Sequence, residues 1–399
     1  MNPEFRVHFS DQAVPMDALK ERAYNLRWAT LEKGTIALTA ADPDFAVAPP
    51  IQKALKDYID SGVFSYGPSE GLPEFRAACA ETTARRKGFM CSPEQILAVD
   101  SAAAGMMHIA RMTLGPGDEA IIFDPVDFLF KASVEAAGGK VKLLAVDPDS
   151  GQFDLDSLGK LLSPRTRLIG VCNPHNPVGR VLTRKELRVI GEFAVEHDLW
   201  ILNDEIWSDI VYDRSSFTSL PSISPEIAAR TFTVHGFSKT FGLAGLRIGF
   251  VIAPDAEGFE RLIEISQART TMTGASTLSQ IAATAAYREC WDWADAFVDH
   301  LRDQRDLAHA RLIGIPGLTC LKPEGTYVLF PSIKALGKPT EEIVQILLTE
   351  GKVAVVPGAA RWFGPGAEGR LRIVLSTSRG ILNEGLNRIE TTLNRIREK

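Results

Sequence analysis

The sequence of 399 residues contains no apolar run that approaches the ~20 residues needed to span a bilayer. Its N-terminus, MNPEFRVHFSDQAVPMDAL, lacks the apolar core of a secretory signal peptide. Positive charge is not in excess, because the formal net charge is -6 and the basic residues are dispersed. These absences predict a cytoplasmic protein that acts on small molecules, with neither nucleic acid nor membrane as a partner.

Cysteine is also scarce. The five cysteines are odd in number and widely spaced, which favours neither a disulfide framework nor a C-x-x-C metal site. The seven histidines show no H-x-x-x-H spacing, so no metal is expected. The nucleotide-binding pattern G-x-x-x-x-G-K-[ST] is absent as well. The pattern is that of a reduced, metal-free protein.

What is present is an ordinary globular composition, with 45% hydrophobic and 24% charged residues. Short apolar runs alternate with amphipathic stretches, which predicts an α/β fold with a mainly parallel central sheet. After about residue 290 long polar helices begin, and a strand is expected at 326–330. We therefore divide the chain into an N-terminal segment, a large α/β domain and a small C-terminal α+β domain, with the boundaries 1–45, 46–290 and 291–399.

The clearest repeating unit lies near the middle of the chain. An apolar strand at 167–172 precedes a loop rich in proline and glycine, and Thr183 with Glu186 forms a capping box that predicts a helix over 184–196. Further strands are expected at 199–203 and 231–234. Because ligands bind beyond the carboxyl ends of strands in open α/β sheets, Asn176, Asp204 and Lys239 should converge.

Lys239 lies in the segment SKTFGLAGLRIG, from Ser238 to Gly249. The small residues let the backbone approach a ligand, and Arg247 could clamp a phosphate. A buried lysine near other cations can have a lowered pKa, form a Schiff base and then act as a general base. The alternative for Lys239 is a solvated surface charge.

The other polar candidates also have two interpretations each. Asp204 could hold a pyridine nitrogen protonated or cap the next helix. Asn176, between two prolines, could bind a phenolic oxygen or only form a turn. Arg372, which alternates with apolar neighbours, could bind an α-carboxylate or be an edge-strand charge. Tyr66, in the turn-rich segment FSYGPSEG, could be a surface aromatic.

Taken in order, these residues resemble the class I/II aminotransferases of pyridoxal-phosphate fold type I, from about residue 40 to the C-terminus. The resemblance implies pyridoxal 5′-phosphate as cofactor, an amino acid as substrate and a role in amino-acid metabolism or biosynthesis. It implies a Schiff base at Lys239, a pyridinium partner in Asp204 and a phenolic-oxygen donor in Asn176. Phosphate contacts are implied for Ser238 and Arg247. Substrate contacts are implied for Ala41, Asn176 and Arg372. A homodimer is also implied, in which Tyr66 reaches the partner's phosphate.

The sequence departs from the family pattern at three places. Relatives have a glycine-bearing phosphate loop where this chain has DSAAAG, and the helix N-terminus at Ser101, Ala102 and Ala103 could still bind phosphate through its N–H groups. Where relatives place an aromatic over the cofactor ring, this chain has Asp127 with Phe128 beside it. Trp207 replaces a tyrosine that donates to the phenolic oxygen; its indole N–H donates but does not titrate like a phenol.

Two alternatives stay open. The segments ADPDF, SGVF, CNPHNP and FGPG are similar to cystathionine β-lyase-like carbon-sulfur lyases, which eliminate a β-substituent instead of transferring the amino group. Against this, the segment GLRIG is similar to the aminotransferase form. A non-catalytic cofactor-binding regulator is the other alternative, and the absence of a helix-turn-helix extension counts against it.

Overall fold

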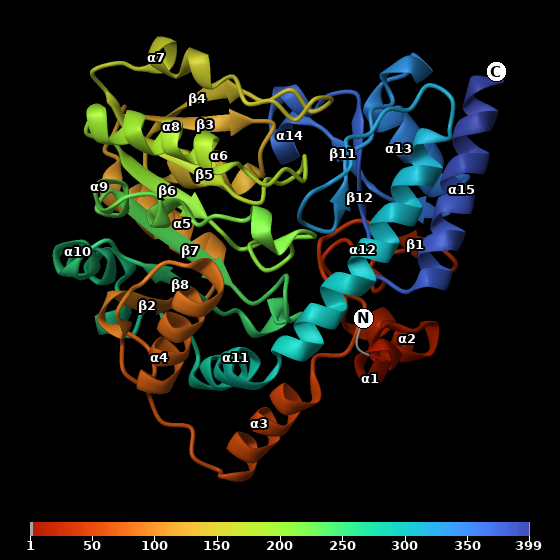
Figure 1. Ribbon diagram of the computed structural model, residues 1–399. Coiled ribbons are helices and arrows are strands. Elements are labelled where there is room, and N and C mark those ends of the chain that lie inside the picture. Colours follow the sequence, from red (N-terminus) through yellow and green to blue (C-terminus); the bar gives the residue numbers. More distant parts are fainter. Residues whose placement is uncertain (1–2, 399) are drawn as a thin grey trace.

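The computed structural model describes residues 3–398, and its centre is a seven-stranded sheet with the order β2-β8-β7-β6-β5-β3-β4 (Figure 1). The strands from β7 to β4 run parallel, whereas β8 is antiparallel to both β7 and β2. The bounds of the sheet strands are Ile96–Val99 (β2), Glu119–Asp124 (β3), Lys140–Ala145 (β4), Thr166–Cys172 (β5), Trp200–Asp204 (β6), Thr231–Gly236 (β7) and Gly249–Ile252 (β8).

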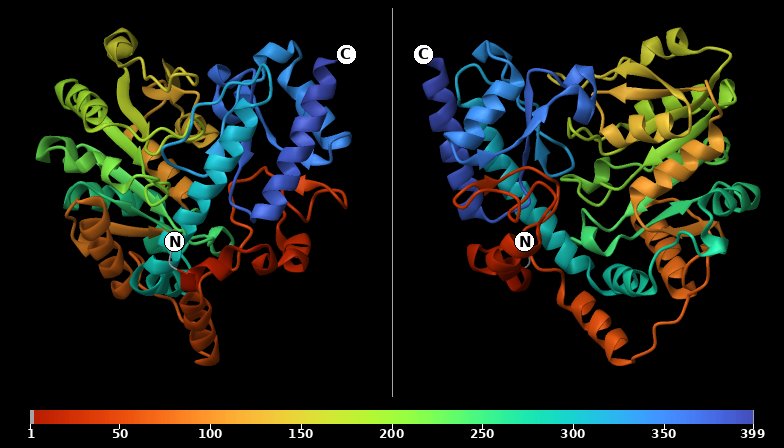
Figure 2. Two further views of the ribbon diagram at one scale, coloured as in Figure 1. Left: turned by 45° about the vertical axis from the view of Figure 1, so that its right-hand side comes forward. Right: turned by 180° about the vertical axis from the view of Figure 1, so that it is seen from behind.

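Helices cover both faces of this sheet (Figures 1 and 2). On one face α5 packs against α6 and α10, and on the other α8 packs against α9. The inner strands are almost entirely buried, as expected of parallel strands covered on both sides. The helices of this part are Pro49–Asp60 (α3), Pro73–Thr82 (α4), Ala102–Thr113 (α5), Phe128–Ala136 (α6), Leu158–Leu161 (α7), Arg184–Glu196 (α8), Pro225–Ala228 (α9), Ala256–Ser266 (α10) and Thr277–Glu289 (α11).

The C-terminal part has its own small sheet, β11-β12-β9, formed by Val356–Gly358, Arg370–Val374 and Val328–Leu329. A two-residue strand near the N-terminus, Ile36–Ala37 (β1), pairs with Val353–Ala354 (β10), so the beginning of the chain lies beside its end. The helices of the two ends are Pro3–Arg6 (α1), Met16–Arg22 (α2), Trp291–Ile313 (α12), Thr340–Thr349 (α13), Ala360–Phe363 (α14) and Arg379–Arg397 (α15).

Several sequence predictions are confirmed here. The strand, helix and strand expected at 167–172, 184–196 and 199–203 are β5, α8 and β6, and the capping box of Thr183 and Glu186 is formed. The strand expected at 326–330 is shorter, because only Val328–Leu329 pairs with β12. The edge-strand interpretation of Arg372 is wrong, since β12 is the middle strand of its sheet. The helix-cap interpretation of Asp204 is also wrong, since turns rather than a helix follow β6. The domain boundaries stay a prediction.

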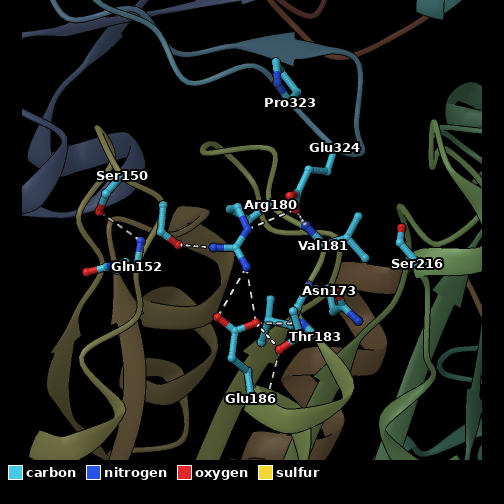
Figure 3. Close-up of polar contacts among 12 residues, drawn as sticks. Ser150, Gln152, Asn173, Arg180, Val181, Thr183, Glu186, Ser216, Pro323 and Glu324 are labelled. Atoms are coloured by element: carbon cyan, nitrogen blue, oxygen red, sulfur yellow. Dashed lines mark hydrogen bonds and ion pairs between the residues drawn. The ribbon is translucent and has the colours of Figure 1, made fainter.

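A cluster of polar contacts around Arg180 joins the loop after β5 to the segment leading into the small sheet (Figure 3). The guanidinium donates to the Gly151 carbonyl (2.6 Å), to Glu324 (2.9 Å) and to Glu186 (3.2 Å). Glu324 also accepts the Val181 N–H at 2.8 Å. The loop that carries Asn176 is therefore held from both of its sides.

One element projects from the body. Helix α3 and the segment after it extend away from the rest of the molecule (Figure 2). Residues 61–68 of that segment are all exposed. Among the described residues, no helix is both long and apolar enough to cross a membrane.

Candidate active site

The three strand ends that should converge do so. In the sheet register Asp204, the last residue of β6, pairs with Cys172 of β5 and with Val234 of β7. Asn176 follows Cys172 by four residues, and Lys239 follows Val234 by five. The parallel order of β5, β6 and β7 therefore delivers a carboxylate, an amide and an amine to one edge of the sheet, as predicted.

Lys239 is half-buried, and its ammonium group has defined neighbours. The Nζ atom donates to the Ala41 carbonyl at 2.8 Å and lies 5.2 Å from the centre of the Trp207 ring. Burial lowers the pKa of Lys239, and Arg372 lowers it further, whereas Asp42, Asp127 and Asp204 raise it. A lysine whose neutral form is favoured in this way can act as a nucleophile and then as a base.

Asp204 is the most strongly perturbed carboxyl of the group. It is 7% exposed, and burial raises its pKa from the ordinary 3.8 to about 7. Its Oδ1 atom accepts the Ile206 N–H at 3.0 Å. A carboxyl in this position would be stabilised as a carboxylate by a positively charged ring nitrogen.

Asn176 is buried, and its amide is only partly satisfied. The Nδ2 atom donates to Asp127 Oδ2 at 2.8 Å, whereas Oδ1 has no hydrogen-bond partner among the described residues. Buried polar groups are normally hydrogen-bonded, so this oxygen is available to accept a hydrogen bond from a bound molecule. No sequence pattern indicated that Asn176 and Asp127 are in contact.

Arg372 approaches the same group from the small sheet. Its guanidinium is 9% exposed, donates to the Thr39 carbonyl at 3.2 Å and lies 5.1 Å from the Phe363 ring. Its Nε has no partner in the part of the chain that the structure describes. Burial lowers the pKa of Arg372, while Asp127 raises it. An incoming carboxylate would satisfy the remaining donor capacity.

Trp207 lines the site from the segment after β6, at 2% exposure. Its ring meets Tyr327 edge-on, with 4.7 Å between the ring centres. The Tyr327 hydroxyl donates to the Ala41 carbonyl at 3.1 Å, the same oxygen that Lys239 contacts. No motif pointed to Tyr327, and its place inside the strand expected at 326–330 was the only sequence signal.

The N-terminus of α5 lies close to the strand ends. Ser101 caps this helix by accepting the Ala104 N–H at 3.1 Å. The N–H groups of Ala102 and Ala103 lie in the helix's first turn, where backbone N–H groups have no acceptor within the helix. A Cβ atom on Gly249 would come within 2.9 Å of the Ala102 nitrogen, so this close approach requires glycine. Backbone N–H groups at a helix N-terminus can bind an anion without a glycine-bearing loop.

The remaining candidates lie further out. Ser238 is half-buried beside Lys239. Phe128 is 40% exposed and contacts the Trp362 ring, 5.6 Å between centres. Arg247 is exposed and has a left-handed backbone conformation with φ of 53°. Tyr66 is 92% exposed on the projecting segment.

The segment 40–44 that contacts Lys239 is fixed from behind. Arg27 is buried, pairs with Asp44 and donates to the Ala40 carbonyl at 2.7 Å. Trp28 donates to the same Asp44 carboxylate at 2.7 Å. The short stretch that includes Ala41 is therefore part of the site's frame, and no pattern in the sequence pointed to Arg27.

Known proteins are similar to this chain over most of its length. The family model for class I and II aminotransferases matches residues 33–389. An aspartate aminotransferase of Pyrococcus abyssi is 35% identical over 368 residues, which cover 90% of this chain and 92% of the relative.

Solved structures are similar over the same length. The aromatic aminotransferase of Pyrococcus horikoshii OT3 has a TM-score of 0.85 at 32% identity, covering 91% of this chain and 97% of that one. A pyridoxal-phosphate-bound structure from Clostridium difficile 630, described provisionally as an aminotransferase, has a TM-score of 0.87 at 28% identity, covering 94% and 98%. The chain belongs to the class I and II aminotransferase family of fold type I, which uses pyridoxal 5′-phosphate.

Proposed function

We propose that this pyridoxal-phosphate-dependent aminotransferase removes the amino group of an α-amino acid through Lys239. The observation that carries the proposal is the place of the Lys239 amine. It lies at the carboxyl ends of β5, β6 and β7, among Asp204, Asn176 and Arg372, with its pKa lowered by burial. The lyase alternative is not favoured, because the family model and the curated relatives are aminotransferases.

The residues present fit the cofactor. Asp204 would pair with its ring nitrogen, and the second amide hydrogen of Asn176 would donate to its phenolic oxygen. Asn176 Oδ1 has no hydrogen-bond partner among the described residues. The phosphate would be held by the groups at the α5 N-terminus and beyond β7: Ser101, Ala102, Ala103, Ser238 and Arg247. Trp207 and Phe128 are the aromatic candidates near the ring. When bound, pyridoxal phosphate withdraws electrons from the substrate's Cα and carries away its amino group.

The chain's own residues would then act in sequence. Arg372 would bind the α-carboxylate and fix the substrate's orientation, with Asn176 and Ala41 as further contacts. Lys239 Nζ takes the proton from Cα and delivers it on the cofactor side. The Ala41 carbonyl, which accepts from Nζ at 2.8 Å, limits where the amine can rest between these steps.

A single-turnover experiment tests this proposal. The purified holoenzyme is mixed with a panel of amino acids and cysteine conjugates in the absence of any keto-acid acceptor. We expect about one equivalent of keto acid per site, no ammonia, and resumed turnover when a keto acid is added. Release of ammonia with pyruvate from a cysteine conjugate would identify a lyase instead, and no reaction with any compound would remove the proposal.

We further propose that the protein acts as a cytoplasmic homodimer in which Tyr66 reaches the partner's phosphate site. The projecting segment supports this, because Val63, Phe64 and Tyr66 are 61%, 64% and 92% exposed on one short stretch. Sedimentation equilibrium of the holoenzyme is expected to give twice the chain's 43.6 kDa. A monomer at micromolar concentration would contradict it.

A further inference from the structure

Asp127 is a carboxylate fixed inside the site, and the cofactor chemistry described above has no use for it. It ends the connection after β3 and caps α6, where its Oδ1 atom accepts the Leu129 N–H at 3.1 Å. Its Oδ2 atom accepts from Asn176 Nδ2 at 2.8 Å. Both oxygens are thus held, and the carboxylate is directed at the amide proposed to face the cofactor and substrate.

The charge of Asp127 also acts on the neighbouring groups. It opposes the lowering of the pKa values of Lys239 and Arg372 that burial causes, and it adds to the rise that burial causes in the pKa of Asp204. These three effects place the carboxylate within electrostatic range of the lysine, the arginine and the cofactor-facing aspartate together. A substrate bound to Arg372 lies inside that range.

A second carboxylate adds to the same field. Asp42, next to Ala41, is the charged neighbour with the largest effect on the pKa of Lys239. Burial raises the pKa of Asp42, and the nearby Arg27 is already engaged by Asp44. Around Lys239 and Arg372, the described chain therefore places three acidic side chains, Asp42, Asp127 and Asp204. In the proposed function Arg372 binds the substrate's α-carboxylate and Lys239 anchors the cofactor, so neither residue is left to pair with a side-chain carboxylate of the substrate.

We propose that Asp127 determines substrate specificity, so that the site disfavours amino acids with an anionic side chain and favours those with a neutral or cationic one. The inference rests on the proposed function and narrows its substrate class. The Asp127 carboxylate, which is held by the Leu129 N–H and by Asn176, would repel a side-chain carboxylate and attract an ammonium or guanidinium. The alternative is that Asp127 has only a structural role, in which it caps α6 and positions Asn176.

The two interpretations differ in what Asp127→Asn does. Loss of a structural role changes the kinetics of all amino acids in the same proportion. Loss of a charge changes ratios between substrates of equal size. The pairs glutamine with glutamate and norleucine with lysine differ mainly in side-chain charge, so their kcat/KM ratios isolate the electrostatic effect.

For the wild-type holoenzyme we expect kcat/KM for glutamine to exceed that for glutamate. In Asp127→Asn the glutamate-to-glutamine and norleucine-to-lysine ratios should each rise by about tenfold, as expected of a unit charge roughly 8 Å away in a partly buried site. Asp124→Asn is the matched control, because Asp124 ends β3 three residues earlier and, among the described side-chain hydrogen bonds, its carboxylate accepts only from the Gly366 N–H. It should leave both ratios within about twofold of wild type.

A second readout does not depend on turnover. The α-methyl analogues of glutamate and ornithine have no Cα proton, so their dissociation constants from the holoenzyme, read from the cofactor absorbance, report binding alone. Asp127→Asn should tighten α-methylglutamate and weaken α-methylornithine. A wild-type preference for glutamate, or ratios that Asp127→Asn leaves unchanged, would overturn the inference. If no amino acid is turned over, the proposed function fails, while the analogue titration still tests the charge selectivity.

Discussion

The residues assigned to the site fall into two groups that differ in exposure. Asp204 and Asn176 are 7% and 3% exposed, and both are held at the carboxyl ends of adjacent strands. Arg247 and Tyr66, to which the family resemblance assigns phosphate contacts, lie on the surface. One chain thus brings Asp204 and Asn176 together by itself, whereas two of the residues proposed to contact the phosphate, Arg247 and Tyr66, face outward.

The two groups also differ in what holds their side chains in place. The buried group is fixed by contacts within the chain: the Lys239 amine on the Ala41 carbonyl, Asn176 on Asp127, and Arg372 on the Thr39 carbonyl. Tyr66 has no comparable packing, since residues 61–68 are exposed throughout. Changes in the buried group should act within one subunit, and changes at Tyr66 should depend on a second one.

The largest effect is expected from Lys239→Ala. Removal of the amine abolishes both the covalent anchor and the proton carrier, so kcat should fall by at least about 10³-fold. Borohydride reduction of the wild type should fix the cofactor on the peptide that contains Lys239, as read by mass spectrometry. Lys131→Ala, at an exposed lysine on α6, is the control. A cofactor fixed on another lysine would refute the assignment.

Arg372→Ala should mainly weaken substrate binding. Loss of a buried charge that pairs with the α-carboxylate costs about 2 to 5 kcal/mol, so KM should rise by at least about 30-fold while kcat changes less. Arg372→Lys retains the positive charge but not the bidentate geometry, so its KM should lie between those of the wild type and Arg372→Ala. A KM that stays at the wild-type value in Arg372→Ala would place the carboxylate elsewhere.

Asp204 predicts a pH dependence of stability in the cofactor-free protein. Its pKa is raised from 3.8 to about 7 in the folded state, so the folded protein holds a proton that the unfolded chain releases in that window. The contribution to the free energy of unfolding is therefore present below the unfolded pKa and lost as the pH rises towards 7, by up to about 1.4 kcal/mol per pH unit.

Buried histidines act in the opposite direction and must be subtracted. Burial lowers the pKa values of His175 and His235 from 6.5 to about 3, which makes stability rise with pH over that range. The informative quantity is thus the difference between wild type and Asp204→Asn in urea unfolding from pH 4 to 7. Parallel profiles for the two proteins would show that Asp204 does not titrate as proposed.

The parts of the fold that the sequence could predict are those set by local signals. The β5-α8-β6 unit follows from local signals, since apolar runs and the Thr183–Glu186 capping box act within a few residues. The convergence of Asn176, Asp204 and Lys239 then follows from parallel order alone.

Contacts between distant segments left no local signal. Lys239 contacts Ala41 across 198 residues, and Tyr327 contacts the same carbonyl across 286. The position of β12 in the middle of its sheet depends on pairing with β11 and β9, which hydrophobic alternation does not specify. Such contacts depend on tertiary packing, so the sequence alone could not show that Arg372 lies in a middle strand and not in an edge strand.

The smallest expected effect tests the exposed group most directly. Tyr66→Phe removes a hydroxyl that would bond to a charged phosphate, so cofactor affinity should weaken by about tenfold. Tyr58→Phe on α3 is the control, because it removes a hydroxyl of the same kind and keeps the ring that contacts Phe64. The effect should be absent there.

Mixing then decides whether Tyr66 acts across subunits. When Tyr66→Phe and Lys239→Ala chains are reassociated in equal amounts at limiting cofactor, a site combining Lys239 of one chain with Tyr66 of the other is wild type. In a symmetric dimer about one quarter of all sites are of this kind, so the mixture should regain tight cofactor binding in that fraction. A mixture that only averages its two components would mean that Tyr66 serves its own chain, and the contrast between buried and exposed groups would then reflect packing within one subunit.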